Sequence, residues 1–383
     1  SWGAQDYRRS CDVPSRSLLP ASLPWRRPQR HCPRPAANWL RAPCHDPSMR
    51  GAGRCRRLGG QVMGCRDGHR WGSLARQEPH PWICRGGGVT EAAKAEELAT
   101  FLSIPAISES RVLLSHTPMR ALAERFHGRR VVIVGSKDTV AVAEHYRFDF
   151  SGGWAVTLAQ LAAGTPSIFP QSFGRKASAP AVDVNAEGAP PIEAILILYE
   201  PDDWAMELQV LTDVLAGGRP LGSGGTPGSV PLAQAAEVFA SNPDFVWQAA
   251  YPVPRYGQGA FLDCLRTLWR RLSRGAELRV TEFGKPHPSQ FSAAQQLLEG
   301  QLRPGEQLQR IYMMGDNPAA DIRGANIARG GAWRSVLVCT GVYRGGPASN
   351  DAADPAWRVE PDLRAAVERL LRAPEDERGG GPE

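Results

Sequence analysis

The feature that most restricts the fold of this chain is an alternation of short apolar runs with helical patterns, which begins near Gly86. Apolar runs at 131–134, 192–198 and 311–314 stop at glycine or at polar residues, and helical patterns follow them. Buried strands that alternate with helices are typical of parallel sheets with helices on both faces. The sequence therefore predicts an α/β fold. Its 383 residues allow two or three domains, at about 150 residues per domain.

Residues 1–85 differ in composition from the rest of the chain. They hold 16 arginines, no lysine, five acidic residues, six of the eight cysteines and five of the eleven tryptophans. The remaining residues hold 29 basic and 34 acidic side chains, so the net charge of +6 comes from the first segment. The cysteines include no C-x-x-C pair, which argues against a zinc finger or ribbon.

Three interpretations of residues 1–85 stay open, because the segment shows neither a helical nor a strand period. It is a disordered basic arm, an Arg-rich organelle transit segment, or sequence that does not belong to the folded protein. The abundance of Trp and Cys is atypical of disorder and favours the third. The polar, Gly-rich residues 373–383 are expected to be a disordered tail. Two Gly- and Pro-rich stretches, 171–190 and 217–228, are expected to be surface loops.

Two aspartates follow the apolar strand that ends at Gly315. Asp316 comes directly after the strand, at the sheet edge where α/β proteins bind ligands, and Asp321 lies in the turn that follows. Two carboxylates near a phosphate suit Mg²⁺, which takes one or two carboxylates and keeps its other positions for water and phosphate. The alternative interpretation is that both residues only cap the next helix.

Lys285 is the second candidate, since it lies between Gly284 and Pro286 about thirty residues before the two aspartates. A lysine in such a loop can direct its ammonium at a phosphoryl oxygen and offset developing negative charge. A lone surface lysine is usually only solvated. The order and spacing of the two motifs would let them converge on one sheet edge.

With these motifs in place, the chain resembles the haloacid dehalogenase superfamily, subfamily IIA, and most closely its cat eye syndrome critical region protein-like branch. The matching stretches run in collinear order over about three quarters of the chain: 86–98, 241–244, 254–261, 284–286, 315–325 and 336–343. The resemblance implies a Rossmann-like core, residues 86–110 and 255–372, and an inserted α/β cap of the larger, C2 type, residues 111–254.

The resemblance also implies chemistry. A nucleophilic aspartate attacks phosphorus, a second aspartate acts as acid and base, and a lysine binds the phosphoryl group beside Mg²⁺. Lys285 matches the phosphate-binding lysine, Asp316 the main Mg²⁺ ligand and Asp321 a second acidic residue at or just behind the metal. Further expected substrate contacts, chosen by position, are Gly86, Gly87, Asn242, Asp244 and Asn317.

The nucleophile motif of the family is not found in this sequence. Family members carry D-x-D at the end of the first core strand, but no two aspartates here are separated by a single residue. The pair Thr-Asn before the glycines is also replaced, by Cys84 and Arg85. Cys84 is a nucleophile by type only, since nothing supplies it with a base. We therefore expect a phosphohydrolase fold whose activity is doubtful in this polypeptide, and an unstable chain if two core strands are lost.

The expected function is that of a Mg²⁺-dependent phosphatase of a small phosphorylated metabolite. The alternative is a non-catalytic relative that binds a ligand or partner. Nucleic-acid binding would rest on the charge of residues 1–85 alone, and we do not expect it. No apolar run approaches the length of a membrane span. The resemblance leaves room for a homo-oligomer through the cap and points to mitochondria, with the cytoplasm as the other location.

Overall fold

The computed structural model describes residues 61–65, 81–105, 107–136, 138–165, 180–184, 186–217, 233–247, 253–328 and 331–372. Most of 1–85, most of the two predicted surface loops and the predicted tail lie outside these residues. The described strands form two larger sheets and a short hairpin.

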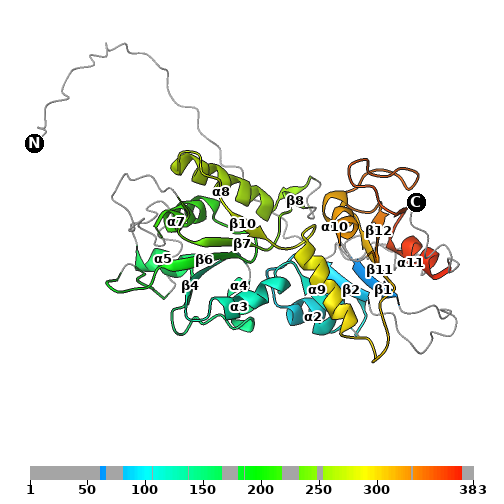
Figure 1. Cartoon of the computed structure of the whole chain (residues 1–383), viewed down its shortest axis with the longest axis horizontal. Coiled ribbons are helices and arrows are strands. Elements are labelled where there is room, and N and C mark those ends of the chain that lie inside the picture. The colour runs from blue at the N-terminus through cyan, green and yellow to red at the C-terminus, as the bar shows by residue number, and fades with distance from the viewer. Residues whose placement is uncertain are drawn as a thin grey trace, which may run out of the picture. The chain divides into compact units, whose positions relative to one another are not determined.

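The first sheet has the strand order β13-β12-β11-β1-β2-β3 (Figure 1). Its strands are β1 (Gln61–Cys65), β2 (Pro81–Arg85), β3 (Val112–Leu114), β11 (Arg310–Gly315), β12 (Trp333–Val338) and β13 (Arg358–Glu360). β11, β12 and β13 are parallel to one another, as are β2 and β3. β1 lies between β11 and β2 and runs antiparallel to both.

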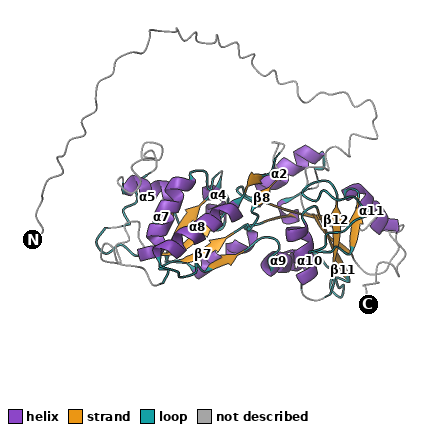
Figure 2. Cartoon of the chain, turned by 90° about the horizontal axis from the view of Figure 1, so that it is seen from above, coloured by secondary structure: helices purple, strands orange, loops and turns teal. Residues whose placement is uncertain are grey.

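Helices cover this sheet because its central strands are apolar on both faces. Side chains that alternate along β11 point to opposite faces. Ile311 and Met313 pack with α9 (Pro288–Glu299) and α10 (Arg323–Ile327), whereas Tyr312 and Met314 pack with α11 (Leu363–Arg372). The helix α2 (Glu91–Leu102) packs on β3 through Ala95 and Leu98. Figure 2 shows α9, α10 and α11 beside β11 and β12.

The second sheet has the strand order β10-β7-β6-β4-β5, and all its pairings are parallel. Its strands are β4 (Arg130–Val134), β5 (Ala155–Thr157), β6 (Ile192–Ile197), β7 (Glu237–Ala240) and β10 (Val280–Glu282). It is covered by the helices η4 (Thr117–Ala121), α3 (Leu122–Arg125), α4 (Thr139–His145), α5 (Leu158–Gly164), α7 (Trp204–Gly217) and α8 (Gln258–Leu272).

The same two-residue alternation builds the core of the second sheet. Val132 and Val134 of β4 belong to the cluster with α5, α7 and α8, while Val131 and Ile133 belong to the cluster with η4, α3 and α4. These four valine and isoleucine side chains are at most 3% exposed. A strand that is buried on both faces reads as a continuous apolar run, which is why 131–134 was recognisable in the sequence.

All strands of the second sheet come between β3 and β11 in the sequence, so this α/β unit is inserted into the first one. The division of the chain between the two sheets does not follow the domain boundaries at 111 and 254 that were predicted from the sequence. β3 belongs to the first sheet, and α8 and β10 belong to the second. The reason for α8 is its apolar face: Phe261, Leu265 and Trp269 are at most 1% exposed and pack with α7 and β6.

The prediction that residues 1–85 contain no strand was wrong for two segments, β1 and β2. Both are held by backbone pairing with neighbouring strands, which a sequence period cannot reveal. A short antiparallel hairpin, β8 (Val246–Trp247) and β9 (Arg255–Tyr256), precedes α8. Among the described helices, none has the length and hydropathy needed to cross a membrane.

Candidate active site

The site is built at the carboxyl end of β11. This strand ends at Gly315, and Asp316 follows at the sheet edge, partly buried. Its Oδ2 accepts a hydrogen bond from the backbone N–H of Val342 (2.7 Å), and its carbonyl accepts one from Tyr343 N–H (2.8 Å). The segment after β12 thus fixes the backbone and the side chain of Asp316 together.

Gly341 makes this close approach possible. A Cβ at this position would lie 1.7 Å from Oδ2 of Asp316, well inside van der Waals contact. The site therefore requires a residue without a side chain at the turn after β12. The sequence contained this glycine within a family-like stretch, but its role became visible only with the distance to Asp316.

Asp321 and Lys285 form a buried ion pair. Nζ of Lys285 lies 2.5 Å from Oδ1 of Asp321, and the two side chains are 17% and 1% exposed. Oδ2 of Asp321 accepts from the backbone N–H of Asn317 (3.1 Å). Asp321 lies in the single-turn π-helix η6 (Pro318–Ile322), which keeps it close to the carboxyl end of β11. The structure thus brings Lys285 and Asp321 together, but not at one sheet edge as expected, because Lys285 follows β10 of the second sheet and Asp321 follows β11 of the first.

The electrostatics of the site are dominated by two neighbouring acids and one lysine. Burial raises the pKa of Asp316, and the negative charge of Asp321 raises it further. The N–H of Val342 and the ammonium of Lys285 act in the opposite direction. Because two carboxylates close together resist ionisation, the arrangement favours a bound cation.

Gly284 sets the backbone that presents Lys285. Its φ is +74°, and a Cβ there would lie 2.4 Å from the carbonyl oxygen of Ser241. Either feature alone disfavours another residue. The loop with Lys285 is therefore fitted against the segment that follows β7.

Asp244 belongs to this neighbourhood. Burial raises its pKa to about 6, the charge of Lys285 lowers it and the charge of Asp321 raises it. Asn242 shapes the loop, since its Oδ1 accepts from Asp244 N–H (3.1 Å) and its own N–H donates to Oε1 of Gln258 (2.8 Å). Of the expected substrate contacts, Asp244 thus interacts with the charged centre, whereas Asn242 supports the loop.

The other expected substrate contacts lie in two places. The backbone N–H of Asn317 donates to Oδ2 of Asp321, as described above, so Asn317 contacts the charged centre through its backbone. Gly87 lies against the ring of His116, and Gly86 is exposed. Nothing in the described structure links Gly86 or Gly87 to Lys285, so their role in substrate binding stays a prediction.

β1 occupies the place from which an attacking carboxylate would be expected. Its first residue, Gln61, pairs with Met314 at the site edge, while its last, Cys65, pairs with Arg310 at the far edge. The strand therefore presents its amino end to Asp316, and its sequence QVMGC contains no acid.

A network around Glu91 was missed by the sequence reasoning. Glu91 is the first residue of α2, and its Oε1 accepts hydrogen bonds from the hydroxyls of Thr117 (2.6 Å) and Tyr146 (2.5 Å). Nδ1 of His116 lies 2.7 Å from the Tyr146 hydroxyl, and burial lowers the His116 pKa to about 4. In sequence, Glu91 looked like an ordinary acidic residue in a first helical turn.

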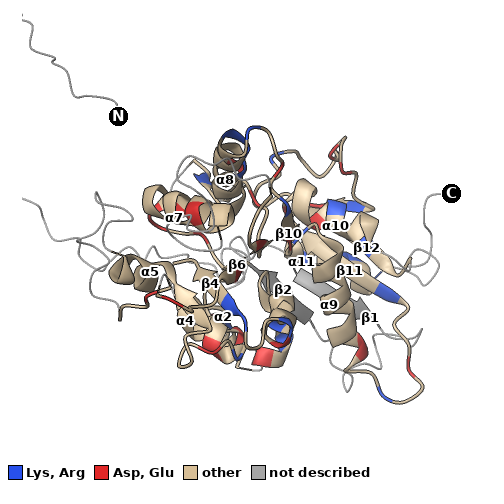
Figure 3. Ribbon diagram, turned by 60° about the vertical axis from the view of Figure 1, so that its left-hand side comes forward, with Lys and Arg blue, Asp and Glu red and all other residues tan. Residues whose placement is uncertain are grey.

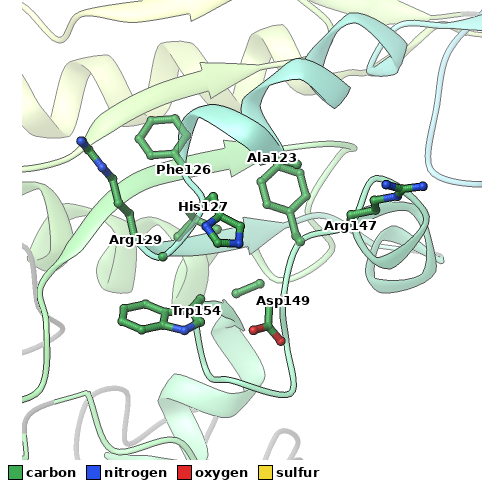
Figure 4. Close-up of a pocket in the computed structure, with 11 residues that line it drawn as sticks. Ala123, Phe126, His127, Arg129, Arg147, Asp149 and Trp154 are labelled. Atoms are coloured by element: carbon green, nitrogen blue, oxygen red, sulfur yellow. The ribbon is translucent and has the colours of Figure 1, made fainter.

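A cavity of about 120 Å³ lies at the amino end of β4 and β5 (Figure 4). Its lining includes Phe126, His127, Arg129, Asp149 and Trp154. Arg129 pairs with Glu193 (3.2 Å), and Oδ1 of Asp149 accepts from Ser151 (2.8 Å) and Gly152 (2.8 Å). Arg129 and Asp149 are thus already engaged, and none of the predicted site residues lines the cavity.

The chain is similar to several known proteins. A family model described as HAD-hydrolase-like matches residues 282–366, which include Lys285, Asp316 and Asp321. A cardiolipin synthase (CMP-forming)/mitochondrial hydrolase fusion protein of Schizosaccharomyces pombe is 34% identical over 275 residues, 70% of this chain and 43% of that protein. The chain thus spans less than half the length of that relative.

A mitochondrial hydrolase of Saccharomyces cerevisiae is 28% identical over 297 residues, which cover 70% of this chain and 79% of that protein. Among solved structures, the glycerol phosphate phosphatase of Mycobacterium tuberculosis in complex with magnesium is similar with a TM-score of 0.45 and 19% identity. The similarity covers 77% of this chain and 69% of that one.

Proposed function

We propose that this chain is a haloacid dehalogenase-like hydrolase in which Lys285, Asp316 and Asp321 bind a phosphomonoester together with Mg²⁺. The match of residues 282–366 to the HAD-hydrolase-like family model supports this. The observation that carries the proposal is the buried contact of Lys285 with Asp321 beside Asp316. One ammonium cannot neutralise two neighbouring carboxylates, so a divalent cation completes the charge balance.

The residues present fit Mg²⁺. Magnesium prefers oxygen ligands and commonly takes one or two carboxylates. Burial and the charge of Asp321 raise the pKa of Asp316, and a cation beside the two carboxylates would offset their repulsion. When bound, the ion would polarise a phosphoryl oxygen and offset its charge. Branch membership within the superfamily stays a prediction.

Lys285 would bind a phosphoryl oxygen through its ammonium. The ammonium of Lys285 would then contact both the substrate and Asp321, and Asp321 holds the lysine side chain in place. Asp244, whose pKa is raised to about 6, would face the same phosphate and limits the total negative charge when protonated. The substrate class that fits these groups is a small phosphorylated metabolite.

Hydrolysis needs an attacking group in addition to this binding half. The 383 residues contain no D-x-D, and β1 presents its amino end to the site. We therefore infer that this polypeptide binds phosphate and Mg²⁺ without rapid turnover. Covalent catalysis by an aspartate requires that carboxylate in line with phosphorus.

The test combines a binding assay with an activity assay on the full chain. We expect Mg²⁺ to raise the melting temperature and inorganic phosphate to raise it further. The whole rise should be lost in Asp316→Asn, whereas Lys285→Met should lose only the part that phosphate adds to the effect of Mg²⁺. We expect no Mg²⁺-dependent hydrolysis of p-nitrophenyl phosphate. Rapid hydrolysis would overturn the non-catalytic half of the proposal, and absence of any phosphate or Mg²⁺ effect would overturn all of it.

The names of the two yeast relatives include mitochondrial hydrolases, and from these we propose a mitochondrial location for this protein. Expression of the full chain with a carboxyl-terminal fluorescent tag tests this. Colocalisation with a mitochondrial marker is expected, and a diffuse cytoplasmic signal would contradict it.

A further inference from the structure

A second group of metal-ligating side chains lies apart from Lys285, Asp316 and Asp321. Glu91 begins α2, Glu109 lies in the short helix η3 (Glu109–Arg111), and His145 is the last residue of α4. One ligand atom from each lies within 4.8 Å of the others, among the residues that the structure describes. Figure 3 shows that α2 carries both acidic and basic residues.

The two oxygens of Glu91 are in different situations. Oε1 accepts the two hydroxyl hydrogen bonds described above, whereas Oε2 is buried and accepts no hydrogen bond in the described structure. Two side-chain nitrogens approach Oε2, Nη2 of Arg120 and Nε2 of His145, and each lies 3.8 Å away. That distance exceeds a hydrogen bond. A buried oxygen without a donor is costly, and a cation at this point would remove the cost.

The cluster offers three donor groups to a small divalent ion, and water would fill the other positions. Nε2 of His145 lies 3.3 Å from Oε1 of Glu109, and both face the Oε2 atom of Glu91. Two carboxylates and one imidazole are ligands that Mn²⁺ and Zn²⁺ accept. We propose that Glu91, Glu109 and His145 form a second divalent-cation site. It joins α2 and η3, which are close in sequence, to the more distant α4.

The surroundings of Glu91 match those of a metal ligand. The hydroxyls of Thr117 and Tyr146 fix its carboxylate from behind and leave Oε2 facing the other two ligands. Such outer hydrogen bonds orient ligands in metal sites. The side chains of Glu109 and His145 are 48% and 35% exposed, so an ion can reach the site from solvent.

Arg120 competes with the proposed cation. Its Nη2 lies 3.1 Å from Nε2 of His145, so it occupies the lone pair that a metal would use. It also lies 3.8 Å from Oε2 of Glu91. The arginine side chain stacks on the ring of Tyr146. Because it is 51% exposed, it can move away into solvent. The guanidinium and the metal ion therefore exclude each other, and removing the guanidinium must tighten metal binding.

The experiment measures Mn²⁺ binding to the full chain by electron paramagnetic resonance, in which the signal of free Mn²⁺ falls as the ion binds. Mn²⁺ is chosen because it prefers oxygen and nitrogen ligands to the cysteine thiols. The unsubstituted chain and Asp316→Asn are compared, so that the first site can be subtracted. Circular dichroism confirms that each variant is folded.

We expect Glu109→Gln and His145→Gln to remove one Mn²⁺ per chain, or to weaken its binding at least tenfold, in both backgrounds. Arg120→Gln should tighten the same binding step. Glu124→Gln is the matched control, because Glu124 is an exposed carboxylate on the neighbouring α3 outside the cluster, and it should change nothing. Unchanged binding in the Glu109 and His145 variants, or weaker binding in Arg120→Gln, would overturn the proposal.

This inference stands apart from the proposed function. Loss of Mn²⁺ from Asp316→Asn tests the first site, and loss from Glu109→Gln tests the second. Either can fail while the other holds.

Discussion

Removing the ammonium of Lys285 is the sharpest test of the charge balance at the site. In Lys285→Met the side chain keeps most of its length and apolar stem, but the carboxylate of Asp321 loses the partner that lies 2.5 Å away. Asp321 is 1% exposed and keeps one donor, Asn317 N–H. The variant therefore leaves a buried negative charge beside the negative charge of Asp316.

The magnitude follows from burial. Breaking a buried ion pair by removing one partner costs about 3–5 kcal/mol. Because Lys285 is 17% exposed and the N–H of Asn317 stays in place, we expect a loss of about 2–3 kcal/mol in the free energy of unfolding. Mg²⁺ should restore part of this loss. Ligand at ten times its dissociation constant contributes about 1.4 kcal/mol.

Urea unfolding followed by tryptophan fluorescence, with and without Mg²⁺, measures both quantities. Arg364→Met is the matched control, since Arg364 forms a comparable 2.8 Å pair with Glu368 on the exposed face of α11. It should leave the midpoint unchanged. A loss below about 1 kcal/mol in Lys285→Met, or no Mg²⁺ effect, would refute the reasoning.

Three further changes test other parts of the site. In Gly341→Ala the new methyl meets Oδ2 of Asp316, so calorimetry should show Mg²⁺ binding that is weaker by roughly tenfold or more. Gly346→Ala is the control, because a methyl there lies in open space, and it should bind Mg²⁺ normally. Gly284→Ala should destabilise by about 1–3 kcal/mol through its φ and its contact with Ser241; Gly275→Ala, with positive φ and open space, should cost less. The pKa of Asp244 is raised to about 6 by burial, so the folded state holds a proton that the unfolded chain releases near its ordinary value of 3.8. Stability should therefore fall as pH rises between these values, by on the order of 1–3 kcal/mol, and melting curves of Asp244→Asn should lack this slope.

The local elements of the fold were predictable because their signals are local. The doubly buried strand β4 reads as an apolar run, and β11 reads as an apolar run stopped by Gly315. Lys285 and Asp321 do meet, but not at one sheet edge, because Lys285 follows β10 of the second sheet and Asp321 follows β11 of the first. Their roles in phosphate and metal binding stay predictions.

What escaped prediction depends on contacts distant in sequence. The three-residue strands β3 and β10 fit either sheet by composition, and only their pairing partners assign them. Tyr146 lies 55 residues from Glu91, so no local pattern connects their side chains. β1 and β2 are short and lie in a segment without a period, and they are defined by backbone pairing to their neighbours.

The position of Gly284 has a mechanical consequence. Only Phe283 and Gly284 separate β10, the edge strand of the inserted sheet, from Lys285, and α9 of the first unit starts at Pro288. Gly284 also lies against Ser241 and Ser115, where the chain leaves β7 and β3. The residue that would hold the phosphate thus sits inside the joint between the two units. A rotation of the inserted unit relative to the first would move the ammonium of Lys285, so the separation of the two units and the release of the phosphate would occur together.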